Sequence, residues 1–179
     1  MIPGFLITWV TFPGVIVHEL AHAIFCRLYG LKIYEIVYFR FAVGFGQAAG
    51  WVVHEPSKKP MQNMMVSIGP FFVNTILGAV IGAPAAIPVL KLESRDPFDL
   101  LLIWLGVSIA MHSFPSTGDA KSIMHSVGSK EVSIFAKIVC YPIIGLIYLG
   151  ALGSVFWLDA IWGVAVAGFL PSLIVKLAS

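Results

Sequence analysis

The chain has 179 residues, enough for one domain; 59% are hydrophobic and 11% are charged, against about 25% charged residues in soluble domains. A mean hydropathy of +0.93 therefore indicates an integral, multi-pass membrane protein that lies in a lipid bilayer. The net charge of +2 and the absence of a basic run longer than Lys58-Lys59 argue against a nucleic-acid partner.

The first predicted element is a transmembrane helix at residues 2–29. No residue from 2 to 17 is charged, and at about 1.5 Å per residue the segment can cross an apolar layer of about 30 Å. It contains the sequence His18-Glu19-Leu20-Ala21-His22. Histidines four residues apart share one helix face, so both can bind one metal ion, and Glu19 lies near enough to move a proton on a water molecule. Ionisable groups at membrane depth are costly, which favours this reading over a pair of packed core histidines.

Residues 31–55 favour strands rather than a helix. Aromatic and β-branched residues dominate the stretch 33–43, glycines at 44, 46 and 50 interrupt it, and Trp51-Val52-Val53 resumes it. We expect one or two hairpins that enter the membrane, where protein or a water-filled cavity must cover their backbone. A surface hairpin among the lipid headgroups is the alternative.

Four further helices are predicted at about 61–90, 98–114, 134–156 and 160–177. Pro84 and Pro88 indicate that the first of these bends, or ends near Ile81. The block Pro115-Ser116-Thr117-Gly118-Asp119 interrupts the chain, and a polar stretch follows to Lys137. The predicted fold is an all-α polytopic membrane protein with about five transmembrane helices and a small membrane-associated β-hairpin region after the first helix. It forms a single domain over residues 1–179.

The positions of lysine and arginine predict an orientation. If five spans alternate in direction, nine of the eleven basic residues, all except Lys91 and Arg95, follow the odd-numbered spans. The positive-inside rule then places the N-terminus outside the cell membrane and the C-terminus in the cytoplasm. His18, His22 and Asp119 fall at similar depth under this scheme, so the active site should lie toward the cytoplasmic side.

A catalytic zinc ion commonly takes three protein ligands and keeps one position for water. Asp119 is our first choice for the third ligand, because it follows a helix break from which a side chain can turn back toward a neighbouring helix. Its alternative role is to cap the next helix, and the two roles can coexist. Cys26, one turn beyond His22, is a further candidate ligand, and His112 is the main substitute for Asp119.

Together these residues indicate hydrolysis of an amide bond. Zinc lowers the pKa of a water molecule and polarises a carbonyl, while Glu19 would act as general base and pass the proton to the leaving amine. The reaction also needs a donor near the developing oxyanion. Asn74, a lone amide in the apolar run 71–77, could be that donor or could form a hydrogen bond between helices.

Three blocks of this sequence resemble the site-2 proteases, a family of intramembrane zinc metalloproteases. His18-Glu19-Leu20-Ala21-His22 is similar to the zinc-binding motif of the first core helix. Gly69-Pro70-Phe71-Phe72-Val73-Asn74 resembles the second core helix block, whose asparagine contacts substrate or the oxyanion. The block ending at Asp119 resembles the one that supplies the last metal ligand, although Ala120 stands where the family usually has glycine. The strands at 44–53 resemble the β segment that holds substrate as an added strand.

The resemblance covers residues 10–125 and implies hydrolysis of peptide bonds in transmembrane protein substrates, as in regulated intramembrane proteolysis. It implies Zn²⁺ as cofactor, His18, His22 and Asp119 as metal ligands, and Glu19 and Asn74 as catalytic residues. The alternatives are a membrane metal-binding or transport protein and a non-catalytic family member. A Glu19→Gln substitution separates the first of these from a protease, because transport should survive it and proteolysis should not.

Overall fold

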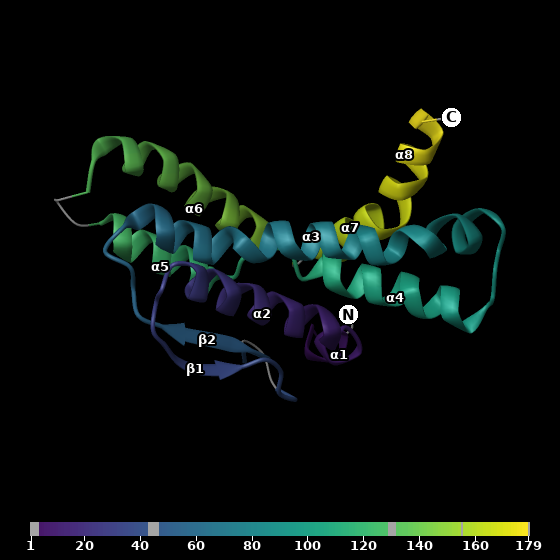
Figure 1. Cartoon of the computed structure of the whole chain (residues 1–179), viewed down its shortest axis with the longest axis horizontal. Coiled ribbons are helices and arrows are strands. Elements are labelled where there is room, and N and C mark those ends of the chain that lie inside the picture. The colour runs from purple at the N-terminus through teal and green to yellow at the C-terminus, as the bar shows by residue number, and fades with distance from the viewer. Residues whose placement is uncertain (1–3, 43–46, 129–131, 155, 179) are drawn as a thin grey trace.

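The computed structural model describes residues 4–42, 47–128, 132–154 and 156–178, and it is mostly helical with one small β-sheet (Figure 1). Its elements are α1 (Gly4–Val10), α2 (Phe12–Leu28), β1 (Ile33–Val37), β2 (Trp51–His54), α3 (Pro60–Lys91), α4 (Pro97–Met111), α5 (Thr117–Val127), α6 (Ile134–Ser154), α7 (Leu158–Val164), the π-helical turn η1 (Ala165–Phe169) and α8 (Leu170–Ala178). The long helix α3 forms the axis of the molecule, and α2 separates it from the sheet (Figure 1).

The first predicted helix is divided in two at Thr11. The Thr11 hydroxyl donates to the Ile7 carbonyl at 2.8 Å, and Pro13 lies in the first turn of α2, where the missing N–H of proline costs nothing. The helix ends where the sequence predicts, because Gly30 takes a φ of +66° that favours glycine. The segment with the two histidines is therefore a separate helix of 17 residues.

The predicted strand region forms one antiparallel pair. β1 and β2 align from Val37 opposite Trp51 to Ile33 opposite His54, with one register irregularity near the start of β1. Two of the three glycines in this region, at positions 44 and 46, lie outside the described residues. The described part of the chain thus contains a single two-stranded sheet, packed beside α2.

The helix α3 continues without a break through Pro70, Pro84 and Pro88, so the alternative end near Ile81 is wrong. Pro70 is fully buried against neighbouring helices, whereas Pro84 lies on an exposed face of α3. α4 and then α5 run antiparallel to it, and successive contacts follow its whole length: Gly82 with Gly106, Gly78 with Ala110, Thr75 with Ser113, Ser67 with Asp119, and Asn63 with Ser126. The break between α4 and α5 therefore lies beside the middle of α3.

From α6 to η1 the chain runs parallel to α3, and α8 then turns away from it (Figure 1). The contacts of this stretch also advance along α3: Met64 with Cys140, Thr75 with Trp162, Gly82 with Ala167, and Leu90 with Gly168. The helix predicted at 160–177 is divided into α7, η1 and α8. Lys91 and Lys176 line one pocket at the far end of α3, whereas five alternating spans would place them on opposite sides of a membrane.

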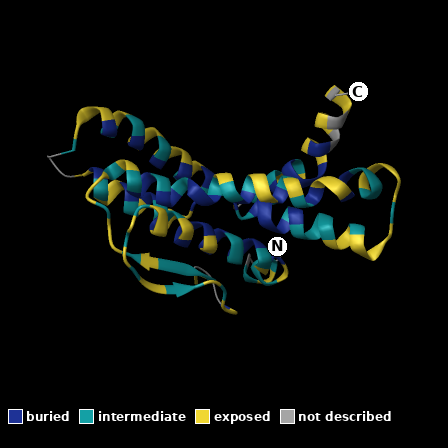
Figure 2. Ribbon diagram, viewed as in Figure 1, coloured by how far each residue is buried: buried dark blue, intermediate teal, exposed yellow. Residues whose placement is uncertain are grey.

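Two helices in the described part of the chain, α3 and α6, are long and apolar enough to cross a bilayer. α4 and the stretch from α7 to η1 are apolar but shorter. Buried residues concentrate where helices meet along α3, while outer faces, including that of α6, are exposed (Figure 2). These exposed faces carry large apolar side chains such as Ile138 and Leu149, as expected for contact with lipid. Five transmembrane helices are not supported.

Candidate metal centre

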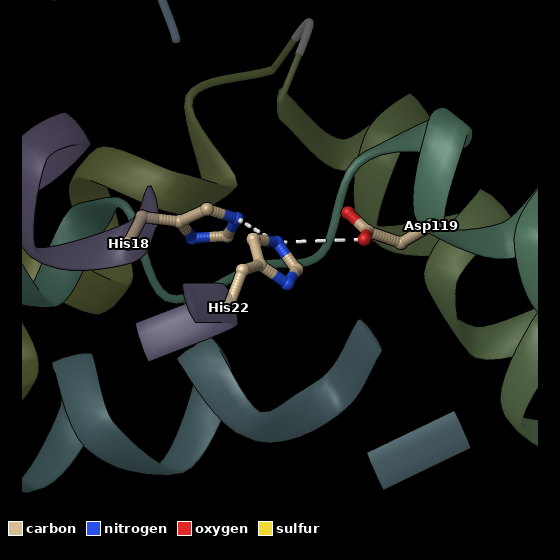
Figure 3. Close-up of side chains that lie close together, drawn as sticks. All are labelled: His18, His22 and Asp119. Carbon is tan, nitrogen blue, oxygen red and sulfur yellow. Dashed lines mark hydrogen bonds and ion pairs between the residues drawn. The ribbon is translucent and has the colours of Figure 1, made fainter. Parts of the chain in front are cut away.

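His18 and His22 project from α2 toward α3 and the start of α5. Their Nε2 atoms lie 3.1 Å apart, and Asp119 Oδ1 lies 3.4 Å from His22 Nε2 (Figure 3). One candidate ligand atom from each of the three residues lies within 4.8 Å of the others. The structure thus gathers the three predicted metal ligands from two helices that are distant in sequence, and this cluster could hold a metal ion.

Backbone carbonyls orient both imidazole rings. His18 Nδ1 lies 2.6 Å from the His112 carbonyl oxygen, and His22 Nδ1 lies 2.9 Å from the Val66 carbonyl oxygen. A carbonyl oxygen only accepts hydrogen bonds, so each Nδ1 must carry the proton and donate it. In a neutral ring the lone pair then lies on Nε2, which is the atom that faces the cluster.

The short contact between the two Nε2 atoms bears on whether a metal ion fits. Two neutral rings whose protons are both on Nδ1 cannot form a hydrogen bond through Nε2. A contact of 3.1 Å between the lone pairs of His18 and His22 is therefore repulsive unless a cation lies against both. Two imidazole nitrogens and one carboxylate oxygen form a ligand set that suits zinc and leaves a position open.

The Asp119 carboxylate has two functions, one for each oxygen. Oδ2 accepts hydrogen bonds from the Ser116 N–H at 2.7 Å and from the Ser116 hydroxyl at 2.6 Å, while the Asp119 N–H donates to Ser116 Oγ at 3.2 Å. This reciprocal pair is a capping box that starts α5. Oδ1 remains directed at His22, so the capping role and the ligand role coexist.

Glu19 lies beside the cluster and is only 8% exposed. The strand segment packs closely over it at Gly50, where a Cβ atom would lie 2.7 Å from Glu19 Cγ. Among the described residues, none donates a hydrogen bond to its carboxylate. Glu19 also lines the two cavities next to the cluster, so its oxygens can reach a water molecule or a peptide held there.

The larger cavity, of about 730 Å³, is a cleft between the metal cluster and the sheet. Its walls include all four residues of β2 and the first residues of α5. The smaller cavity, of about 260 Å³, opens on the other side of Glu19 and reaches His112 and Asp159. The three candidate ligands therefore border a space of the size that holds ligands rather than a sealed core.

Asn74, the predicted oxyanion donor, is buried where α2, α3 and α4 meet. Its Nδ2 lies 3.1–3.2 Å from the carbonyl oxygens of Gly14, Ile109 and His112, and its Oδ1 has no partner among the described residues. It lines neither cavity beside Glu19. The structure thus shows the interhelical hydrogen bonds that the sequence left as the alternative, and a catalytic role for Asn74 stays a prediction.

The other candidate ligands lie outside the cluster. Cys26 is fully buried one turn beyond His22, and the His112 ring bonds the Ser108 carbonyl through Nδ1. His112 contributes its backbone carbonyl instead, a role that sequence reasoning missed because every residue has such a group. The pattern Ser116-x-x-Asp119 was a readable signal for the capping box.

Comparison of the chain with protein-family models, with curated protein sequences and with solved structures found no match. The chemistry of this site must therefore be argued from its own residues.

Proposed function

We propose that the protein is an intramembrane zinc metalloprotease that hydrolyses peptide bonds of transmembrane proteins. The observation that carries this proposal is the convergence of three lone-pair atoms, two Nε2 and one Oδ1, while both Nδ1 atoms are engaged by carbonyls. Glu19 beside this cluster adds the acid–base group that a hydrolase needs and a metal store does not. The resemblance of the three sequence blocks to site-2 proteases supports the same assignment.

The residues of the chain divide the work of hydrolysis as follows. Bound zinc, held by His18, His22 and Asp119, would lower the pKa of a water molecule and polarise the scissile carbonyl. Glu19 accepts the proton of that water and delivers it to the leaving amine. The carbonyls of Val66 and His112 keep the histidine rings in place throughout.

The sheet supplies a surface for an unwound peptide. β2 pairs with β1, and all four residues of β2 line the cleft that contains the metal cluster. A transmembrane helix hides its carbonyls in its own hydrogen bonds, so it must unwind before cleavage. We infer that the unwound segment adds to β2 as a further strand, with main-chain hydrogen bonds holding it beside Glu19.

We propose that the chain crosses the membrane as four units: α2, α3, α4 with α5, and α6 with α7, η1 and α8. This grouping follows from the contacts along α3, which put the end of α4 and the start of α7 beside the middle of that helix. Val66 lies six residues into α3, about 9 Å from its start. The metal cluster would thus lie within the membrane, near the end where α3 begins.

The basic residues orient these four units. One end of the molecule carries Arg27, Lys32, Lys58, Lys59 and Lys137, while the other carries Lys91, Arg95 and Lys176. The positive-inside rule then keeps the metal cluster toward the cytoplasm but places both chain termini outside the cell membrane.

Single-cysteine labelling tests this orientation. Lys58→Cys, Arg95→Cys and Lys176→Cys introduce reactive thiols, while the native Cys26 and Cys140 are fully buried. Positions 95 and 176 should label from the same side and position 58 from the other. Labelling of 58 and 176 from one side would contradict the four units and favour five spans.

Glu19→Gln is the central test of the proposed activity. The purified variant should keep one zinc ion per chain, because Glu19 is not a ligand, while cleavage of a transmembrane peptide should fall about 10²–10⁴-fold with loss of the general base. Metal content is measured by elemental analysis and cleavage by mass spectrometry. Full cleavage by Glu19→Gln would refute the mechanism, and iron in place of zinc would refute the cofactor.

A further inference from the structure

The carbonyl that orients His22 lies inside a helix, where carbonyls normally have a partner. In an α-helix the carbonyl of one residue accepts from the N–H four positions later. For Val66 that position is Pro70, which has no N–H to give. Val66 therefore lacks its helical donor at the point where the His22 ring approaches.

The His22 ring supplies the missing donor. Its Nδ1–H lies 2.9 Å from the Val66 oxygen, and both Val66 and Pro70 are almost fully buried. A buried carbonyl without a partner is costly, so the structure favours a ring that donates to it. Donation through Nδ1 in turn leaves Nε2 free to face Asp119.

The carbonyl that orients His18 also lacks a backbone donor. It belongs to His112, at the end of α4, and the residue three positions later is Pro115. The N–H four positions later, on Ser116, donates to Asp119 Oδ2 instead. The His112 oxygen is therefore open to His18 Nδ1 at 2.6 Å, and it also accepts from Asn74.

We propose that Pro70 is a positioning residue of the metal centre: by withholding an N–H from α3, it reserves the Val66 carbonyl for His22 and so fixes the Nε2 lone pair toward the metal. At His18, Pro115 withholds the N–H three positions after His112 and the Ser116 N–H donates to Asp119 Oδ2, so that the His112 carbonyl is open to His18. The proposal rests on the proposed metal centre and is independent of proteolysis.

The test compares Pro70→Ala with Pro84→Ala in the same helix. Each substitution adds one N–H to α3 and removes one proline ring. The carbonyl freed by Pro84 is that of Val80, and within the described residues no side chain donates to it. Pro84→Ala therefore makes the same backbone change away from the histidines, at an exposed position, whereas Pro70 is buried.

Two measurements decide the outcome. Zinc affinity, titrated against a competing chelator, should fall about 10–100-fold in Pro70→Ala, as for other partners of metal-bound histidines, and should stay within about threefold of the parent in Pro84→Ala. The ¹⁵N spectrum of histidine-labelled, metal-free protein should show His22 as the Nδ1–H tautomer in the parent. Pro70→Ala should populate the Nε2–H tautomer. A His22→Gln variant assigns the signal.

Unchanged zinc affinity and an unchanged His22 tautomer in Pro70→Ala would overturn the proposal. An equal loss of affinity in Pro84→Ala would also overturn it, because the effect would then come from the helix as a whole. If Pro70→Ala does not fold, Pro115→Ala applies the same test at His18, where the same two changes are expected. If the parent binds no zinc, the proposed function fails, but the tautomer comparison still tests Pro70.

Discussion

The two halves of α3 are held to their neighbours by different means. Along residues 60–75 the contacts include hydrogen bonds between helices, in addition to apolar packing such as that of Gly69 on Phe25: Asn63 bonds Ser126, the Val66 carbonyl accepts from His22, and Thr75 bonds Ser113. Along residues 76–91 they are steric, because Gly78 and Gly82 bring α3 against the backbones of Gly106 and Ala167. The first half carries the chemistry, and the second fixes the distance between the helices that carry it.

In the membrane-spanning arrangement that we propose, this difference would let polar groups lie at membrane depth without loss of packing. Between apolar helices in lipid, close approach of small residues supplies much of the association, and side-chain hydrogen bonds add modest amounts. The glycine half can thus hold the helices together without ionisable groups. The polar half is then free to direct its donors and acceptors at a metal ion and a cleft.

The largest effect should come from the polar half. His22→Ala should abolish stoichiometric zinc binding and cleavage, because it removes one of three ligands and the partner of Val66. His125→Ala, at an exposed position on α5, is the control and should leave both intact. Elemental analysis of purified protein checks the result, and one zinc per chain in His22→Ala would sink the ligand assignment.

The glycine half should respond in stability rather than in metal content. A Cβ at Gly78 would lie 2.7 Å from both Ala110 Cβ and the Gly106 oxygen, so Gly78→Val should lower the free energy of unfolding by about 3 kcal/mol. At Gly145 on α6 a Cβ meets nothing within 4 Å, and Gly145→Val should change little. Unfolding in detergent measures the stability of both variants. The zinc content per folded chain should be unchanged in each. Equal stability of the two variants would contradict the steric contact.

Asn74 sits at the boundary between the halves and separates two predictions. If it only bonds carbonyls of α2 and α4, Asn74→Ala should cost about 2 kcal/mol of stability, while the zinc-loaded fraction keeps cleavage within about threefold of the parent. If it acts on the oxyanion, stability should hold while the rate falls at least about a hundredfold. Steady-state rates per bound zinc distinguish the two, and we expect the first.

The smallest effect on cleavage should come from a substitution in the wall of the cleft that lies opposite the metal cluster. Ala48 lines the cleft next to Glu19, three residues before β2, so Ala48→Pro removes a main-chain donor that a substrate strand on β2 could reach beyond the strand's start. We expect cleavage to fall about tenfold, or about 1.4 kcal/mol, with zinc content unchanged. Tyr34→Ala on β1, away from the cleft, should be mild. Loss of zinc in Ala48→Pro would instead show that this segment supports the fold.

The metal cluster was predictable because its spacing is local. Two histidines four apart on a helix share a face in any helix, and Asp119 follows a break marked by Pro115. The backbone carbonyls that orient the two histidines were not predictable. Every residue has a carbonyl, and only the arrangement of neighbouring helices shows which carbonyl a histidine ring can reach. Asn74 shows the same limit: its position in an apolar run signals a buried amide, but not which groups it bonds.

The helix arrangement was only partly predictable. The helix α5 was not predicted from the sequence, because the stretch after Asp119 is polar. Ala120, Ile123 and Val127 nevertheless have helical spacing, and all three are fully buried. α5 packs its apolar face on α3 and α6, so α4 and α5 follow one path along α3 instead of ending a span at residue 114. The prolines of α3 were a misleading signal in the other direction, because the helix continues through all three of them.

The two oxygens of the Asp119 carboxylate have different roles. Removing a bound metal ion should therefore affect the protein less than replacing Asp119. A chelator would remove a bound ion from Oδ1 and leave the bonds of Oδ2 to Ser116, so the start of α5 should survive without the ion. Replacing Asp119 removes both the metal-binding oxygen and the capping bonds to Ser116. The cluster is thus assembled before any ion binds, so an ion could enter or leave it without unfolding the start of α5.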